Sequence, residues 1–276
     1  MSGLVLTLRE APKQRVDVSP LTPTALAGKK PAEVAAITLL CGNRRIRADA
    51  LFDIAGTMVM PGDEGSVTIK KATTRLDRIG AGMKAGTISV EGDAGAYAGF
   101  GMTGGVIEIS GSAGVFTAST MEGGEIRIGG DVGDFLGAAL PGERVGMRGG
   151  VVKVFGDAGA RAGDQLRRGM LLIAGDAGPY CGARMIAGTI LVLGKTGDRI
   201  GFGMRRGTIL LAHAPAQMLA TFNDCGQHEL QFLRLLTQHI GGAKPFAALK
   251  RFGDRVRRYA GDRGVGGQGE ILIREP

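Results

Sequence analysis

The sequence of 276 residues has no tryptophan, few other aromatic residues, three histidines and three cysteines. Cys41, Cys181 and Cys225 do not make the disulfide framework that a small exported domain needs. There is no run of eighteen apolar residues and no apolar N-terminal segment of the signal-peptide type. We therefore expect a reduced, soluble, cytoplasmic protein that makes no contact with a membrane.

Basic residues are in excess, with a formal net charge of +8, which predicts an acidic partner. Nucleic acid is a poor candidate for that partner, because no recognised binding module is present and few aromatic residues could stack on bases. The hydrophobic share of 44% allows a substantial core and argues against disorder.

Glycine is abundant, with 49 residues, but it lacks the Gly-X-Y period of collagen. It recurs instead every nineteen residues, with one gap of twenty-six that indicates an inserted loop near 139–145. The clearest glycine column consists of Gly86, Gly105, Gly124, Gly150, Gly169, Gly188 and Gly207. Such a fixed period is typical of a repeat architecture.

Between these glycines, apolar residues alternate with other residues, which predicts short strands with one buried face. One apolar column consists of Ile88, Ile107, Ile126, Val152, Leu171, Ile190 and Ile209. A unit of nineteen residues is too short for a helical repeat. We predict a mainly β fold, a single-stranded β-solenoid in which each coil adds one rung at a spacing of about 4.8 Å.

Three regions follow from the limits of the repeat. Residues 1–64 are expected to form an irregular N-terminal β region and cap, residues 65–213 the solenoid, and residues 214–276 a C-terminal helical extension. In the first region, strands are expected at Leu4–Arg9 and Thr57–Met60, with loops at its prolines.

The last region is expected to hold two helices and a strand. An amphipathic helix is predicted at His228–Ile240, ended by Gly241 and Gly242. A basic helix is predicted from Pro245 to about Tyr259, followed by a short strand at Glu270–Arg274.

An apolar strip is predicted on the outside of the late rungs. The outward strand column ends in Leu172, Leu191 and Leu210, which should not remain exposed. We expect either the chain's own helix at His228–Ile240 or a partner protein of a larger complex to cover them.

Two parts of the sequence resemble a known family. The repeat at Asp77–Met83, Gly86–Val90 and Gly92–Gly95 resembles the GXGXG repeat of the glutamate synthase C-terminal domain and of the C subunit of formylmethanofuran dehydrogenase. The C-terminal part of the sequence resembles the end of the second of these proteins, the C subunit of formylmethanofuran dehydrogenase. The resembling segments are Phe222–Cys225, Phe232–Leu236, Arg258–Asp262 and Gly267–Leu272. This resemblance implies a right-handed parallel β-helix and a place in a one-carbon enzyme complex.

The family includes two kinds of complex. In methylotrophic bacteria, the formyltransferase/hydrolase complex transfers a formyl group from tetrahydromethanopterin to a methanofuran analogue and releases formate. In methanogens, formylmethanofuran dehydrogenase reduces CO2 with molybdenum or tungsten on other subunits. The composition, rich in alanine and arginine, favours the bacterial complex, in which this chain would be a noncatalytic scaffold. A stand-alone β-helix carbohydrate-active enzyme is the alternative of another class.

No catalytic or metal site is predicted on this chain. Cys225 and His228 have ligand-like spacing, but a metal site needs three or four ligands. Aspartates at one repeat position could bind calcium, although hydrogen bonds to turn amides are the simpler role. These aspartates are Asp93, Asp131, Asp157 and Asp176.

Charge is polarised along the repeat. Residues 76–142 contain three basic and eight acidic residues, net −5, whereas residues 143–210 contain eleven basic and five acidic, net +6. Repeated arginines repel one another unless an anion lies between them. The resemblance supplies an anion, because methanofuran-type carriers have a glutamate-containing tail and arginine suits carboxylates. The predicted tail-binding residues are Arg148, Arg161, Arg167, Arg168, Arg199, Arg205 and Arg206; contacts with acidic faces of the other subunits remain the alternative.

Overall fold

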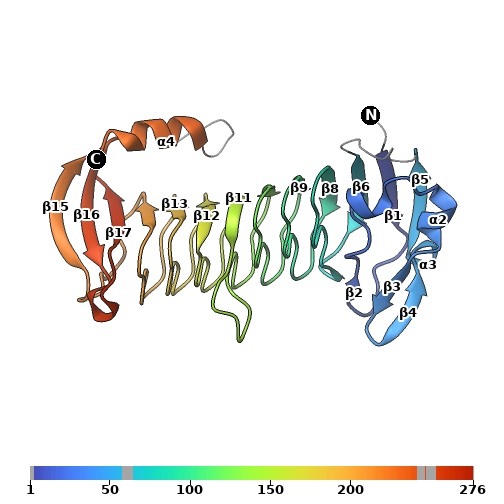
Figure 1. Cartoon of the computed structure of the whole chain (residues 1–276), viewed down its shortest axis with the longest axis horizontal. Helices are drawn as coiled ribbons and strands as arrows, with labels where there is room; N and C mark the ends of the chain where they lie inside the picture. Colours follow the sequence, from blue (N-terminus) through green and yellow to red (C-terminus); the bar gives the residue numbers. More distant parts are fainter. Residues whose placement is uncertain (1–2, 58–64, 241–245, 247–252, 276) are drawn as a thin grey trace.

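The computed structural model describes residues 3–57, 65–240, 246 and 253–275. The protein is mainly β, and Figure 1 shows coils stacked side by side into one long column. A sheet of thirteen strands runs along the column, and a sheet of four strands lies at its N-terminal end. Within the described ranges, no helix is both long and apolar enough to cross a membrane.

Each repeat contributes one strand to the large sheet. These strands are β8 (Thr87–Gly92), β9 (Val106–Ile109), β10 (Glu125–Ile128), β11 (Arg148–Val154), β12 (Arg168–Ile173), β13 (Thr189–Val192) and β14 (Thr208–Leu211). Neighbours pair in parallel with equivalent residues opposite each other, as Ile107 and Ile126 do. A second contact per coil joins equivalent residues such as Ala158 and Ala177. The period of nineteen therefore predicted the stacking register correctly.

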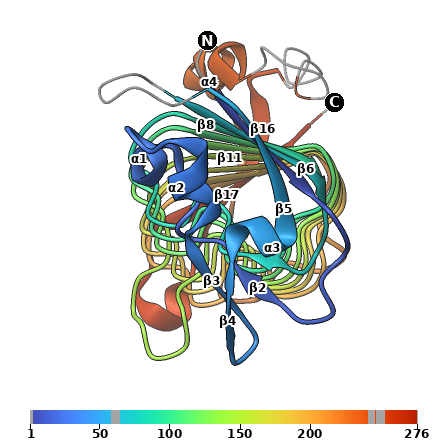
Figure 2. The same ribbon diagram turned by 90° about the vertical axis from the view of Figure 1, so that its right-hand side faces the viewer.

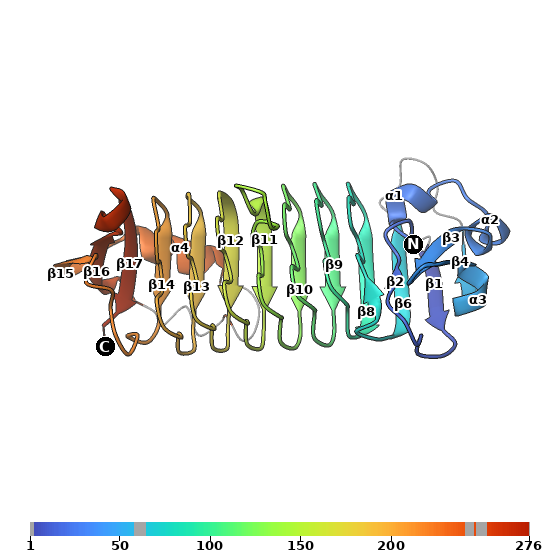
Figure 3. The ribbon, with the colours of Figure 1, turned by 90° about the horizontal axis from the view of Figure 1, so that it is seen from below.

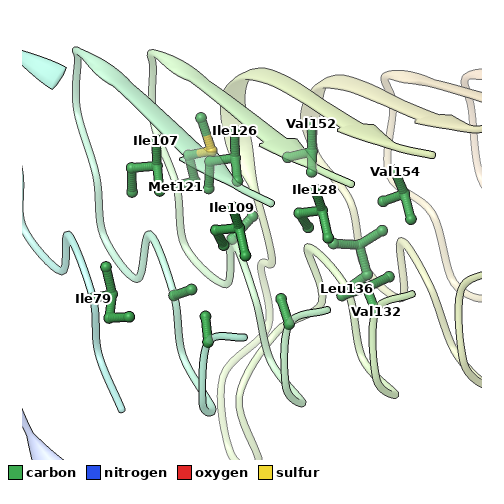
Figure 4. Packing of buried hydrophobic residues seen from close by; sticks show 14 of the residues in the cluster. Ile79, Ile107, Ile109, Met121, Ile126, Ile128, Val132, Leu136, Val152 and Val154 are labelled. Carbon is green, nitrogen blue, oxygen red and sulfur yellow. The ribbon is translucent and has the colours of Figure 1, made fainter. Parts of the chain in front are cut away.

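The core fills the inside of the column. Figure 4 shows Ile107, Ile126 and Val152 in one row, with Met121 packed among them. All four are buried. The repeated glycine column has a structural cause, as Gly207 illustrates: its φ is +103°, and a Cβ there would lie 2.8 Å from the backbone carbonyl oxygen of Gly188.

The predicted inserted loop is confirmed and projects from the column (Figures 1 and 2). This insertion loop, residues 138–146, departs after Gly137, and the chain re-enters the coil at Met147, whose N–H donates to the Gly137 carbonyl at 2.8 Å. Because the coil closes at its base, β10 and β11 still pair without a shift, with Glu125 opposite Val151.

The N-terminal region continues the large sheet. β1 (Gly3–Leu8) pairs in parallel with β6 (Ser66–Ala72) and antiparallel with β5 (Phe52–Gly56). The strand predicted at Leu4–Arg9 is thus confirmed, whereas β5 ends before Thr57, and residues 58–60 of the second predicted strand lie outside the described residues.

A small sheet and three short helices complete this end. The strands are β2 (Val16–Asp17), β3 (Thr38–Cys41), β4 (Arg44–Arg47) and β7 (Leu76–Asp77), and the helices are α1 (Pro23–Leu26), α2 (Pro31–Ala35) and α3 (Ala48–Leu51). Pro23 and Pro31 were expected in loops, but each occupies the first position of a helix, where the missing N–H costs no hydrogen bond.

The C-terminal region folds back onto the column as three strands. β17 (Gly269–Arg274), predicted at Glu270–Arg274, pairs in parallel with β14 and adds one more rung. β16 (Arg255–Gly261) and β15 (Asn223–Glu229) follow in antiparallel order. The basic helix predicted up to Tyr259 is therefore wrong over its described end, because the backbone of Arg255–Tyr259 pairs with a strand on each side.

The longest helix of the described residues, α4 (Phe232–Ile240), begins later than predicted because residues 228 and 229 belong to β15. Its predicted glycine end lies outside the described residues. Figures 1 and 3 show α4 alongside the late rungs. Leu172, Leu191 and Leu210 are fully buried in one cluster with Leu233 and Phe246. The chain therefore covers its own apolar strip, which was the first of the two expected alternatives.

Candidate functional site

The seven predicted arginines lie in three places on the late rungs. Arg148, Arg167 and Arg168 line one cavity; Arg205 and Arg206 line others nearer the C-terminal strands. Arg161 and Arg199 lie at a coil corner, outside those cavities. The structure thus brings the arginines together in groups rather than into a single site.

The first group forms a charged cavity of about 350 Å³ with Glu122. Arg148 on β11 lies opposite Arg168 on β12 in the strand register. An ion pair of 3.1 Å joins Arg148 to Glu122, and both side chains are largely exposed. Within the described part of the chain, Arg167 and Arg168 have no carboxylate partner. This cavity can therefore accept an external anion.

The corner group is held by an aromatic ring. The guanidinium carbons of Arg161 and Arg199 lie 4.7 Å and 5.6 Å from the ring centre of Tyr180. Both arginines have a positive φ, as does Tyr180, because all three occupy the same left-handed corner of successive coils. Arg161 also contacts Asp164 at 3.2 Å. Its charge is thus already used within the chain, which makes this group less suited to binding an anion.

A cavity of about 750 Å³ lies near the C-terminal strands and is called here the C-terminal trough. It is lined by Arg144 of the insertion loop and by Val265 of the short helix η2 (Arg263–Val265). Rung residues also line it, among them Arg184, Ile186, Phe202 and Arg205. A neighbouring cavity of about 480 Å³ shares Arg205 and contains Arg206.

Buried carboxylates shape this trough. Asp164 is 2% exposed and accepts hydrogen bonds from Arg184 at 2.8 Å and 2.5 Å, which raise the pKa of that guanidinium. Asp262 is 4% exposed and accepts N–H groups from Gly203 and Gly264, at 2.9 Å and 2.8 Å. These bonds fix Arg184 and the η2 turn in place, so the walls of the trough are preformed.

Sequence reasoning identified Arg205 but missed Arg184, Phe202 and Asp262 as parts of one cavity. The position of the inserted loop could have indicated Arg144. The contribution of Asp262 and Val265 depends on β17 folding back beside β14, which no local pattern in the sequence predicts.

The other candidates have structural roles. The side chains of Asp93, Asp131, Asp157 and Asp176 each accept the backbone N–H of a residue in the next coil, which confirms the hydrogen-bonding interpretation. His228 contacts the carbonyl oxygen of Cys225 at 3.1 Å, and the described ranges contain no cluster of side chains suited to a metal ion. Burial raises the pKa of the Cys181 thiol to about 12, so this thiol stays protonated.

Comparison with known proteins identifies relatives of this chain. No protein-family model matches it. It is 38% identical to a chain in the crystal structure of the formyltransferase/hydrolase complex FhcABCD from Methylorubrum extorquens with methylofuran. The likeness covers 99% of this chain and 100% of that one, with a TM-score of 0.89.

Curated relatives match over shorter segments. The C subunit of the Methylorubrum extorquens formyltransferase/hydrolase complex is 40% identical over 90 residues, 33% of this chain and 32% of that protein. The C subunit of the tungsten-containing formylmethanofuran dehydrogenase 2 of Methanothermobacter marburgensis is 32% identical over 99 residues, 36% and 37% of the two chains. The matched segment thus spans about a third of each curated relative's length.

The stacked coils and the basic late rungs define a repeat-built, mainly β protein with a surface suited to anions. Its relatives make the assignment more specific. The chain belongs to the family formed by the C subunits of the formyltransferase/hydrolase and formylmethanofuran dehydrogenase complexes.

Proposed function

We propose that this chain is the noncatalytic scaffold of a cytoplasmic formyltransferase/hydrolase complex. That complex would transfer a formyl group from tetrahydromethanopterin to a methanofuran analogue and release formate, with the chemistry on its other subunits. The likeness to a chain of the FhcABCD complex, over almost the whole length at 38% identity, is the observation that carries this proposal. The same family relationship supports a right-handed parallel β-helix as the form of the column.

The late rungs supply a binding role for this scaffold. The charged cavity at Arg148, Arg167 and Arg168 would hold the acidic tail of the carrier, with Arg206 extending the basic surface beyond it. The guanidinium groups of Arg167 and Arg168, which have no carboxylate partner among the described residues, support this role, because arginine binds carboxylates through two parallel hydrogen bonds. Holding the tail would raise the effective concentration of the formyl-bearing end at the catalytic sites.

A molybdenum or tungsten formylmethanofuran dehydrogenase is the second candidate, because relatives from methanogens carry that name. Purification of the native complex through a tag on this chain, with mass spectrometry and metal analysis, separates the two. We expect subunits of formyltransferase and amidohydrolase type without molybdenum or tungsten. Either metal together with iron–sulfur subunits would identify the dehydrogenase, and elution of the chain alone would contradict both.

A further inference from the structure

The C-terminal trough differs in chemistry from the charged cavity. Among the described residues, the charged cavity is lined by Arg148, Arg167, Arg168 and Glu122, whereas the trough combines arginines with a largely apolar surface. Phe202 and Val265, two of its apolar residues, are 44% and 52% exposed. Exposed apolar surface of this kind inside a concave site usually marks a binding site for a protein or another ligand.

The arginines of the trough differ in whether a carboxylate of the chain already binds them. Arg184 is neutralised by buried Asp164, so its guanidinium is fixed and partly satisfied. Arg144 and Arg205 have no carboxylate partner anywhere in the described residues. A fitting ligand therefore presents one or two carboxylates to Arg144 and Arg205 and an apolar group to Phe202 and Val265.

We propose that the C-terminal trough binds a segment of another protein of the complex in which a bulky apolar side chain is flanked by aspartate or glutamate. This rests on the proposed scaffold function, which supplies the partner. A polycarboxylate tail has no apolar group for the surface beside Phe202 and would leave it exposed. The carboxylates would bind Arg144 and Arg205, and the apolar side chain would lie between Phe202 and Val265.

Preformed walls favour tight binding of such a segment. Asp262 holds η2 against the last rung, so Val265 does not have to be ordered when the partner binds. Less conformational entropy is then lost on association. The interface would be centred on Phe202, because exposed aromatic residues in concave sites are common binding hot spots.

The test places a photo-crosslinking phenylalanine analogue at position 202 of the chain within the purified complex. We expect a crosslink to one partner peptide that contains an apolar residue next to aspartate or glutamate. The double variant Phe202→Ser, Val265→Ser should raise the Kd of that partner about tenfold or more. Phe232→Ser, which changes a similarly exposed phenylalanine on α4, should leave it unchanged.

Three outcomes would overturn the inference: a crosslink to the carrier, no crosslink to any partner in an intact complex, or equal weakening by Phe232→Ser. Thermal unfolding of each variant controls for misfolding. Arg144→Ser is a second variant of the trough, at an exposed loop position, and tests the same binding without changing the core. Failure of the scaffold proposal is distinguishable, since the chain would then purify without any partner to crosslink.

Discussion

Aspartate side chains connect one coil to the next along the column. The Oδ1 atom of Asp131 accepts the N–H of Asp157, whose own Oδ1 accepts the N–H of Asp176, which in turn accepts the N–H of Lys195. The distances are 2.8, 2.7 and 2.6 Å. A carboxylate acceptor gives a stronger bond than a neutral one, so each aspartate stabilises the turn of the following coil.

Replacing one of these aspartates should destabilise the protein measurably. Asp157→Ala is expected to lower the free energy of unfolding by about 1 kcal/mol, because the N–H of Asp176 loses its acceptor. Chemical denaturation followed by circular dichroism measures this loss. Asp198→Ala is the control, since the structure records no hydrogen bond or ion pair for this exposed side chain among the described residues. An equal loss in both variants would contradict the assigned role.

At the level of single residues, the repeat made the candidate site partly predictable. Column positions located Arg148, Arg167 and Arg168, and the structure places all three at one cavity. Arg161, Tyr180 and Arg199 share one repeat position, and the structure places the Tyr180 ring against both guanidinium groups. The repeat does not predict the ion pair of Arg184 with Asp164, because these residues occupy different positions of the repeat. Side chains at equivalent positions of different coils become neighbours predictably, whereas contacts between different corners depend on the full three-dimensional coil.

Among the secondary-structure elements, α4 has one buried face and one exposed face. Leu233 is fully buried in the cluster with Leu172, Leu191 and Leu210, whereas Leu235 is 71% exposed. The two leucines are two residues apart and therefore lie on different faces of the helix. Only one of these faces stabilises the isolated chain.

The two leucines should respond differently to truncation. Leu233→Ala is expected to lower the free energy of unfolding by about 2–4 kcal/mol, because it removes buried methyl groups and leaves a cavity. Leu235→Ala should change it by less than about 0.5 kcal/mol. Urea denaturation gives both values, and hydrogen exchange shows whether α4 opens. Similar values for the two variants would mean that α4 does not pack on the rungs as described.

Sequence patterns predicted the rungs and β17 but missed β15 and β16. β8 to β14 share one pattern, so seven copies reinforce one prediction. β16 has no such support: Arg255–Tyr259 carries basic residues compatible with a helix, and its strand conformation is set by β15 and β17 on either side. The hydrogen-bonding partner, rather than the local sequence, decides the structure there.

Charge is distributed unevenly along the whole molecule, with acidic residues on the early rungs and basic residues on the late rungs. Acidic side chains of the early rungs are largely paired within the chain, as Glu125 is with Arg127 and Lys153. These two cations lower the pKa of the Glu125 carboxyl despite its partial burial, so it stays ionised at neutral pH. The uncompensated charge therefore lies on the late rungs, where Arg167 and Arg168 have no carboxylate partner in the described part of the chain.

Removing that charge should impair use of the carrier. Arg167→Ser, Arg168→Ser is expected to raise the KM for a long-tailed carrier about tenfold at low salt, with kcat and the composition of the complex unchanged, because two charge-assisted contacts are lost. Steady-state kinetics at several salt concentrations measures this effect. Arg44→Ser, Arg45→Ser removes the same charge from exposed β4 at the other end of the column and should have no effect. An unchanged KM in the first variant would exclude tail binding at these residues.

The pairing of β17 with β14 also sets an order of events during synthesis. Thr208 and Glu270, bonded through their side chains at 2.9 Å, are 62 residues apart in the chain. At a translation rate of roughly 5–20 residues per second, the ribosome needs roughly 3–12 s to make the segment between them. The coils up to β14 can stack as they emerge, and their open edge stays available to other strands until β17 arrives. The growing column is thus most prone to mispairing in the interval between the synthesis of β14 and that of β17.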